Sequence, residues 1–160
     1  MKELLDKLSS YNLFNYLLPG TIFVAAAQRI SAHTFKDENL VVELFLYYFI
    51  GMVISRFGSL TIEPALKNVK FIKFAPYKDF IRANAKDAKI EVLSEQNNTY
   101  RTLCAMFVSL GLLKLYDIAV VWKPRTTRTA VIVGLFVLFA FAYRKQTDYV
   151  RKRVEAAVRD

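Results

Sequence analysis

The chain has 160 residues, of which 54% are apolar and 23% are charged, and its net charge is +9. The charged residues are absent from two long stretches, residues 8–28 and 129–143. Segments of this length that are apolar on every side argue against an ordinary soluble domain and indicate an integral membrane protein. In such a protein the basic excess points first to anionic lipid, and alternatively to nucleic acid or an anionic small molecule.

Residues 1–10 mix charged side chains with leucines at helical spacing, and no small-residue cleavage site follows them cleanly. This pattern favours a short helix lying in the membrane interface over a cleaved signal peptide.

A helix needs about 20 residues to cross a bilayer, and spans packed against protein can be somewhat shorter. Four segments are expected to cross the membrane as helices: residues 11–28, 40–57, 102–122 and 129–143. In the first, Pro19-Gly20 predicts a kink, or the end of an interfacial helix. Asn15 is expected to face protein or the interface, and Gly20 is expected to let another helix approach closely.

The third and fourth spans are predicted to form an antiparallel hairpin, because the turn between them, residues 123–128, is short and contains Pro124. Orientation follows from the Lys and Arg counts. With both termini inside, the inner segments hold seventeen of these residues and the outer loops five. This bias places the termini and the middle segment in the cytoplasm. We expect the membrane to be a bacterial inner membrane.

The middle segment is predicted to form two basic helices. One is expected to begin near Thr61–Pro64 and to end before Pro76. The other is expected to run from Tyr77 to about Glu95, with a narrow apolar seam at Ile81, Ala85, Ala88 and Val92. The fourth span has no stop signal, so its helix is expected to continue to the C-terminus. The chain thus divides into residues 1–58, 59–101, 102–143 and 144–160.

The cytoplasmic basic residues are candidate ligands for a nucleotide or single-stranded oligonucleotide, with neighbouring aromatic rings available to stack on bases. Lipid headgroup binding and simple topology signalling are the alternatives, and no glycine-rich phosphate loop accompanies these residues. The candidate ligand-binding residues are Lys67, Lys70, Lys73, Lys78, Arg82, Lys86, Lys89 and Arg101.

Three ionisable residues fall within the predicted spans: Glu43, Lys114 and Asp117. Ionisable groups at membrane depth face the protein interior or water. They are therefore expected either to pair and order the helices, or to line the path of an ion or solute.

Catalysis finds little support. The single histidine, His33, lies in a predicted outer loop without a nucleophile arranged around it, and no metal-ligand spacing occurs. Cys104, the single cysteine, is expected to be a small buried apolar side chain, and it excludes an intramolecular disulfide. We expect no enzymatic activity, no metal and no cofactor.

In size, four-span plan and basic cytoplasmic helices, the chain resembles the small membrane effectors of bacterial anti-phage systems, in particular the channel subunit of Hailong-type systems. This resemblance covers the overall plan and no individual residue, so no family site is carried over. It implies a homo-oligomer that is regulated by a nucleic-acid-like signal and partnered with a signal-synthesising enzyme. The expected fold is an all-α, integral membrane four-helix bundle with cytoplasmic helical extensions. The expected function is an oligomeric channel or pore; a non-conducting scaffold that recruits a soluble partner is the alternative.

Overall fold

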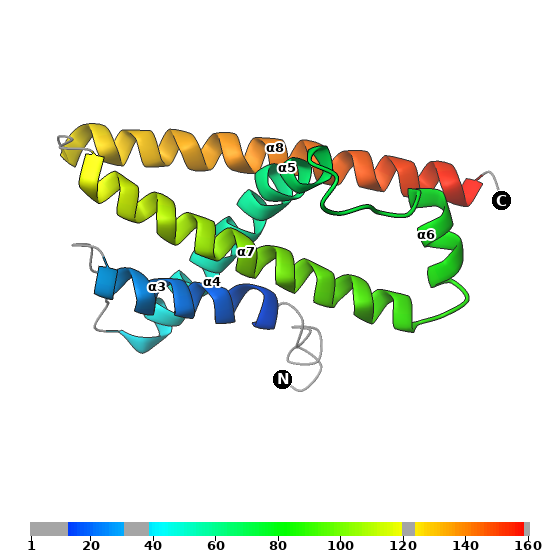
Figure 1. Cartoon of the computed structure of the whole chain (residues 1–160), viewed down its shortest axis with the longest axis horizontal. Coiled ribbons are helices and arrows are strands. Elements are labelled where there is room, and N and C mark those ends of the chain that lie inside the picture. The colour runs from blue at the N-terminus through cyan, green and yellow to red at the C-terminus, as the bar shows by residue number, and fades with distance from the viewer. Residues whose placement is uncertain (1–12, 31–38, 120–123, 159–160) are drawn as a thin grey trace.

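A computed structural model of the chain describes residues 13–30, 39–119 and 124–158 (Figure 1). These residues are helical almost throughout and contain no strand, so the all-α prediction is confirmed for them. The predicted interfacial helix at residues 1–10 and His33 lie outside the described residues. The helices are η1 (Leu13–Leu17), α3 (Leu18–Ile30), α4 (Leu40–Phe57), η2 (Gly58–Ile62), α5 (Glu63–Asn68), α6 (Tyr77–Asn84), α7 (Lys89–Ala119) and α8 (Pro124–Val158).

The first helix continues through Pro19-Gly20, so the predicted helix end at this point is wrong. The π-helical turn η1 leads directly into α3, and Pro19 lies near the start of α3. Proline cannot donate to the preceding turn, and a wide π-helical turn is one way for a helix to accommodate a missing donor. The two elements therefore act as one helical segment that begins at Leu13.

Two glycines set the crossing of this segment with α4. A Cβ on Gly20 would lie 1.8 Å from the carbonyl oxygen of Tyr47, and one on Gly51 would lie 1.7 Å from that of Tyr16. No larger residue fits at either position, because backbone atoms stand in the way. The close approach predicted for Gly20 is confirmed, and Gly51 is its counterpart on α4.

The apolar core lies where α3, α4 and α7 meet. Ile54 of α4 packs with Ala105 and Met106 of α7, and Phe23 of α3 lies against them. Helix α8 runs beside this group along α4, with the rings of Phe49 and Phe139 6.2 Å apart. None of the side chains between residues 130 and 149 is buried. In the described residues, α3, α4 and α7 thus pack together and α8 rests on α4, while the expected four-span bundle stays a prediction.

Two helices in the described part of the chain are long and apolar enough to cross a membrane: Leu40–Asn68 and Ala130–Tyr149. Figure 1 shows that α3 and α7 end, and α4 and α8 begin, at the same end of the molecule. Helix α6 and the C-terminal part of α8 lie towards the opposite end.

The predicted helices of the middle segment need correction. Helix α4 runs on through η2 and α5 without interruption, so no helix begins at Thr61. The predicted helix from Tyr77 to Glu95 is two helices, because α6 ends at Asn84 and the Asp87 side chain accepts a hydrogen bond from the backbone N–H of Lys89 at 2.9 Å, which starts α7. The predicted seam is thus divided, and Val92 is exposed.

Two further predictions are settled by the last helices. Helix α8 extends unbroken to Val158, which confirms the continuation of the fourth span, but it begins at Pro124, so residues 124–128 are helix and not turn. Cys104 is exposed on α7, so its predicted burial is wrong. The next two residues, Ala105 and Met106, take the buried face instead.

Candidate functional site

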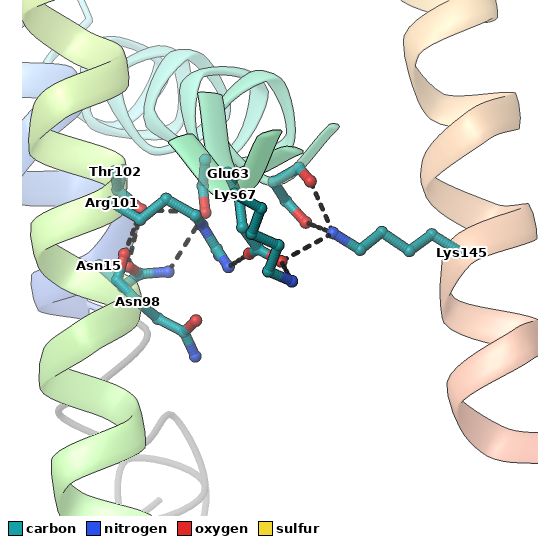
Figure 2. A network of polar contacts seen from close by, with 9 residues as sticks. Asn15, Glu63, Lys67, Asn98, Arg101, Thr102 and Lys145 are labelled. Atoms are coloured by element: carbon teal, nitrogen blue, oxygen red, sulfur yellow. Dashed lines mark hydrogen bonds and ion pairs between the residues drawn. The ribbon is translucent and has the colours of Figure 1, made fainter. Parts of the chain in front are cut away.

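The carboxylate of Glu63 is the centre of an ion cluster that joins three helices. Glu63 is only 5% exposed, at the point where η2 passes into α5. Its Oε1 accepts a hydrogen bond from Nζ of Lys67 at 2.8 Å, and its Oε2 accepts one from Nη1 of Arg101 at 2.8 Å. Nζ of Lys145 lies 3.6 Å from Oε1. We call these four residues the Glu63 cluster; Figure 2 shows Arg101 entering it from α7 and Lys145 from α8.

The positions of the cluster follow from local helical geometry. Lys67 lies four residues after Glu63, so the two side chains share one face of α5. Arg101 and Lys145 come from 38 and 82 residues further along the chain, and reach Glu63 because α7 and α8 pass on either side of α5 (Figure 2). The cluster therefore connects the packed helices to α8.

Pro64 explains why Lys145 finds a second partner. In an α-helix the carbonyl of Ser59 would accept from the N–H of Glu63, but that N–H donates to the carbonyl of Gly58 in the π-helical turn. The next N–H along would be that of Pro64, which has none. Lys145 takes this place and donates to the Ser59 carbonyl at 2.6 Å and to its hydroxyl at 2.8 Å.

A buried polar network adjoins the cluster. Asn15 is 1% exposed, and its Nδ2 lies 3.5 Å from the hydroxyl of Ser55. The Thr102 hydroxyl lies 3.0 Å from Oδ1 of Asn15, 3.1 Å from the Ser55 hydroxyl and 2.9 Å from the carbonyl of Asn98. Because this hydroxyl carries one proton, it donates to one of these oxygens at a time. The protein-facing position predicted for Asn15 is confirmed, and the network ties η1, α4 and α7 together beside Arg101.

A cavity of about 430 Å³ lies over the cluster, between the end of α4, η1, η2, α5, α6, α7 and α8. We call it the junction pocket. The basic side chains that line it are Arg56, Lys67, Arg101 and Lys145, against the single acidic side chain of Glu63. Arg101 has a further donor to offer, since its Nε–H is buried without a hydrogen-bond partner among the described residues. The pocket is thus strongly cationic and only partly neutralised.

Aromatic rings form much of the remaining lining of the junction pocket. Five aromatic residues line the pocket: Tyr16, Phe74, Tyr77, Phe80 and Tyr149. The rings of Tyr77 and Tyr149 stack with centroids 5.9 Å apart, which joins α6 to α8. Nζ of Lys67 lies 4.2 Å from the centre of the Phe74 ring. Cations next to flat rings suit a ligand that combines a phosphate with an aromatic or heterocyclic group.

The candidate ligand residues are divided by the structure. Lys67 and Arg101 meet at Glu63 and line the junction pocket. The other six are not among the residues that line it: Lys70, Lys73, Lys78, Arg82, Lys86 and Lys89. A ligand-binding role for these six residues stays a prediction.

The candidate intramembrane residues lie on helix ends that Figure 1 places together, Glu43 near the start of α4 and Lys114 and Asp117 near the end of α7. Glu43 accepts a hydrogen bond from the hydroxyl of Tyr47 on its own helix. Lys114 donates to the carbonyl of Ile30, the last residue of α3, at 3.0 Å. Lys114 thus provides a hydrogen-bond donor for a carbonyl at the C-terminal end of α3. A role of Glu43, Lys114 and Asp117 in lining the path of an ion or solute stays a prediction.

Sequence reasoning missed the centre of the site. Neither Glu63 nor Lys145 stands out as a candidate in the sequence, because Glu63 falls within the expected helix start at Thr61–Pro64 and Lys145 directly follows the fourth predicted span. A usable signal was present: Glu63 is the one acidic residue between Glu43 and Asp79, and it follows an apolar run and precedes a proline. A lone acid in a basic, apolar stretch tends to have buried partners.

Comparison with known proteins adds no assignment. No protein-family model, curated protein or solved structure matches this chain.

Proposed function

We propose that this chain is the subunit of an oligomeric ion channel in a bacterial inner membrane, controlled through the junction pocket by a cytosolic nucleotide or short oligonucleotide. The Glu63 cluster carries the proposal. There one carboxylate holds cations from α5, α7 and α8 at the edge of a cavity with excess positive charge. A ligand phosphate entering this cavity meets the groups that hold three helices together.

Four spans are part of the proposal, with α3 and the second half of α7 crossing beside the two helices that are long and apolar enough to do so. The excess of Lys and Arg at the junction-pocket end supports a cytoplasmic position for the pocket. Four thin helices enclose little space, so a path for ions requires several copies. The exposed apolar side chains of α8, among them Val131, Ile132 and Phe136, suit contact with lipid or with a second copy.

Gating would follow from the loose attachment of α8. This helix rests on α4, and at the pocket Lys145 contacts η2 and α5 while Tyr149 contacts α6. A ligand that binds two arrangements of α8 with different affinity shifts the balance between them. The closed and open states would be two such arrangements, with the resident contacts of Lys145 favouring one of them.

The resemblance to anti-phage effectors suggests a biological setting for such a channel. The signal would come from a nucleotide-synthesising enzyme, and opening would collapse the ion gradients of the infected cell. A gene for such an enzyme beside this one would support that setting.

Conductance recordings test the proposal. The purified protein is reconstituted in planar bilayers, and ATP, a cyclic dinucleotide or a short single-stranded oligonucleotide is added to each side in turn. We expect current that responds to one of these ligands from the pocket side. Bilayers with and without phosphatidylglycerol separate a free ligand from a lipid headgroup of the same phosphate chemistry. Intact oligomers that pass no current under any condition would refute the channel.

Two matched lysines on α8 test whether the channel responds to its ligand through the junction pocket. Lys145→Gln removes a cation from the pocket, whereas Lys152→Gln removes one that pairs with Asp148 further along the same helix. We expect only Lys145→Gln to shift the ligand response. Equal behaviour of the two variants would remove the junction pocket from the mechanism.

A scaffold remains the second candidate because α6 offers a surface for a partner: none of its residues is buried. Neutralising Glu43, Lys114 and Asp117 together discriminates the two functions. A scaffold that folds keeps its partner, whereas a channel loses or changes its conductance.

A further inference from the structure

The segment that follows α5 exposes apolar side chains between lysines. Val69 is 72% exposed, Phe71 77% and Phe74 46%, and the intervening Lys70 and Lys73 are also exposed. Apolar and basic side chains thus alternate along a surface that no described helix covers. Water alone is a poor environment for such a set.

The backbone holds this segment in its outward position. The N–H of Lys70 donates to the carbonyl of Lys67, and the N–H of Phe71 to that of Leu66, each at 3.0 Å. This is the hydrogen-bond pattern with which many helices end at a residue in the left-handed conformation, normally a glycine. Here that residue is Lys70, with φ of 59°. A lysine thus occupies a position where the backbone conformation favours glycine, and backbone strain of this kind often occurs at functional sites.

The usual packing of this motif is missing. The residue after the left-handed position commonly packs back against the last turn of its helix. Phe71 occupies that position and nevertheless stays largely exposed. The Phe71 ring is therefore free to contact lipid or another protein molecule.

Lys67 does not belong to this surface. It turns to Glu63 and covers the ring of Phe74. The three lysines spaced three residues apart therefore lie in different surroundings. Lys67 lines the junction pocket, whereas Lys70 and Lys73 lie on the exposed segment with Phe71.

The level of the segment relative to the membrane follows from the helix that precedes it. Leu40–Asn68 is one helix of 29 residues. At about 1.5 Å per residue it extends about 43 Å. The hydrocarbon layer is about 30 Å thick, and the bilayer with its headgroups about 40–45 Å. The length of the helix thus matches the full bilayer, so a helix with Leu40 in one headgroup layer places Val69 and Phe71 in the opposite headgroup layer.

We propose that Val69 and Phe71 insert into the interface of an anionic bilayer, with Lys70 and Lys73 on the lipid phosphates. The alternation of the two residue types fits this occupant, because the interface offers acyl chains and anionic groups within a few ångströms of each other. The segment anchors the end of α5, and with it Glu63. This inference rests on the proposed crossing of the bilayer by Leu40–Asn68, but it needs neither a channel nor a nucleotide ligand.

Fluorescence quenching in nanodiscs tests the insertion. Phe71→Trp is made in the full chain in a Trp122→Phe background, which leaves one tryptophan. Lys86→Trp, at an exposed position in the turn between α6 and α7, is the matched control. Lipids with acyl chains brominated near the headgroup are compared with unbrominated ones. In phosphatidylglycerol nanodiscs we expect Phe71→Trp to lose most of its emission and Lys86→Trp to lose little.

The charge requirement is tested in the same system. Lys70→Gln/Lys73→Gln should reduce the quenching at position 71, and Lys86→Gln/Lys89→Gln, a pair of equal charge on the next turn, should leave it unchanged. Phe71 and the four substituted lysines are exposed, so these changes should leave the fold intact. Unquenched emission at position 71 in anionic nanodiscs overturns the proposal. Emission at position 71 that is shielded without bromine quenching, and only at high protein concentration, would identify a second copy as the occupant instead.

Discussion

Replacement of Gly51 by alanine should separate the first helical segment from α4. The new Cβ would lie 1.7 Å from the carbonyl oxygen of Tyr16 and 2.6 Å from its carbonyl carbon. Both atoms belong to the backbone, so no side chain can rotate away, and the helices must part by more than 1 Å. Overpacking of this kind costs about 1–3 kcal/mol, and the top of that range applies where only backbone can move.

The effect should extend to the polar network, because Asn15 precedes Tyr16 and would move away from Thr102. The assay is unfolding of the purified protein in mixed micelles, with the helical signal followed as the denaturing detergent increases. Gly134→Ala is the matched control: nothing lies within 4 Å of the position of its Cβ, and alanine is favoured over glycine inside a helix by up to about 1 kcal/mol. The two substitutions should therefore change stability in opposite directions. A Gly51→Ala variant as stable as the wild type would refute the helix crossing described here.

Two further substitutions examine the site by the same unfolding assay. Glu63→Gln leaves Arg101 and Lys145 facing each other without a carboxylate and should cost about 2–3 kcal/mol, less than a fully buried pair because these cations are partly exposed; Asp148→Asn, which removes an exposed partner of Lys152, should cost under about 1 kcal/mol. Equal losses would mean that Glu63 does not join the helices. Thr102→Val removes the hydroxyl between Asn15 and Ser55 and should cost about 1–3 kcal/mol. Thr147→Val, whose hydroxyl is exposed and bonds within its own helix, should stay within about 0.5 kcal/mol, and a larger loss there than at Thr102 would contradict the buried network.

The parts of the fold that the sequence predicts well are those governed by local composition. Uncharged runs predict the helices at α3 and α8, and an apolar run with few charges predicts α4. The close approach expected at Gly20 is also found, because a residue without a side chain lets two crossing helices come together. Asn15 was correctly kept from lipid, since an amide is costly there. These inferences need no knowledge of which segments meet.

Two of the failures have a common physical cause, which is competition between neighbouring signals. The spacing from Ile81 to Val92 suits one helix, but the Asp87 side chain and the bonds of Lys86 and Asp87 to the carbonyl of Ala83 favour a turn. Thr61 and Pro64 carry the signals of a helix start, although a helix already under way accommodates them through a π-helical turn. Where a segment carries the local signals of both a continuous helix and a turn or new helix start, the local pattern alone does not determine which one the chain adopts.

The candidate site shows why long-range partners escape such reasoning. Glu63, Arg101 and Lys145 lie far apart in the sequence, and no periodicity connects them. Even so, part of the arrangement has a local origin. In the π-helical turn the N–H of Glu63 donates to the carbonyl of Gly58 and not to that of Ser59, and Pro64 has no N–H to donate. The carbonyl of Ser59 therefore needs a donor from outside its own helix. The helix that supplies this donor, α8, is the one with no buried side chain between residues 130 and 149. A single defect in the backbone hydrogen bonding of one helix thus becomes an attachment point for another, next to a pocket with unbalanced positive charge.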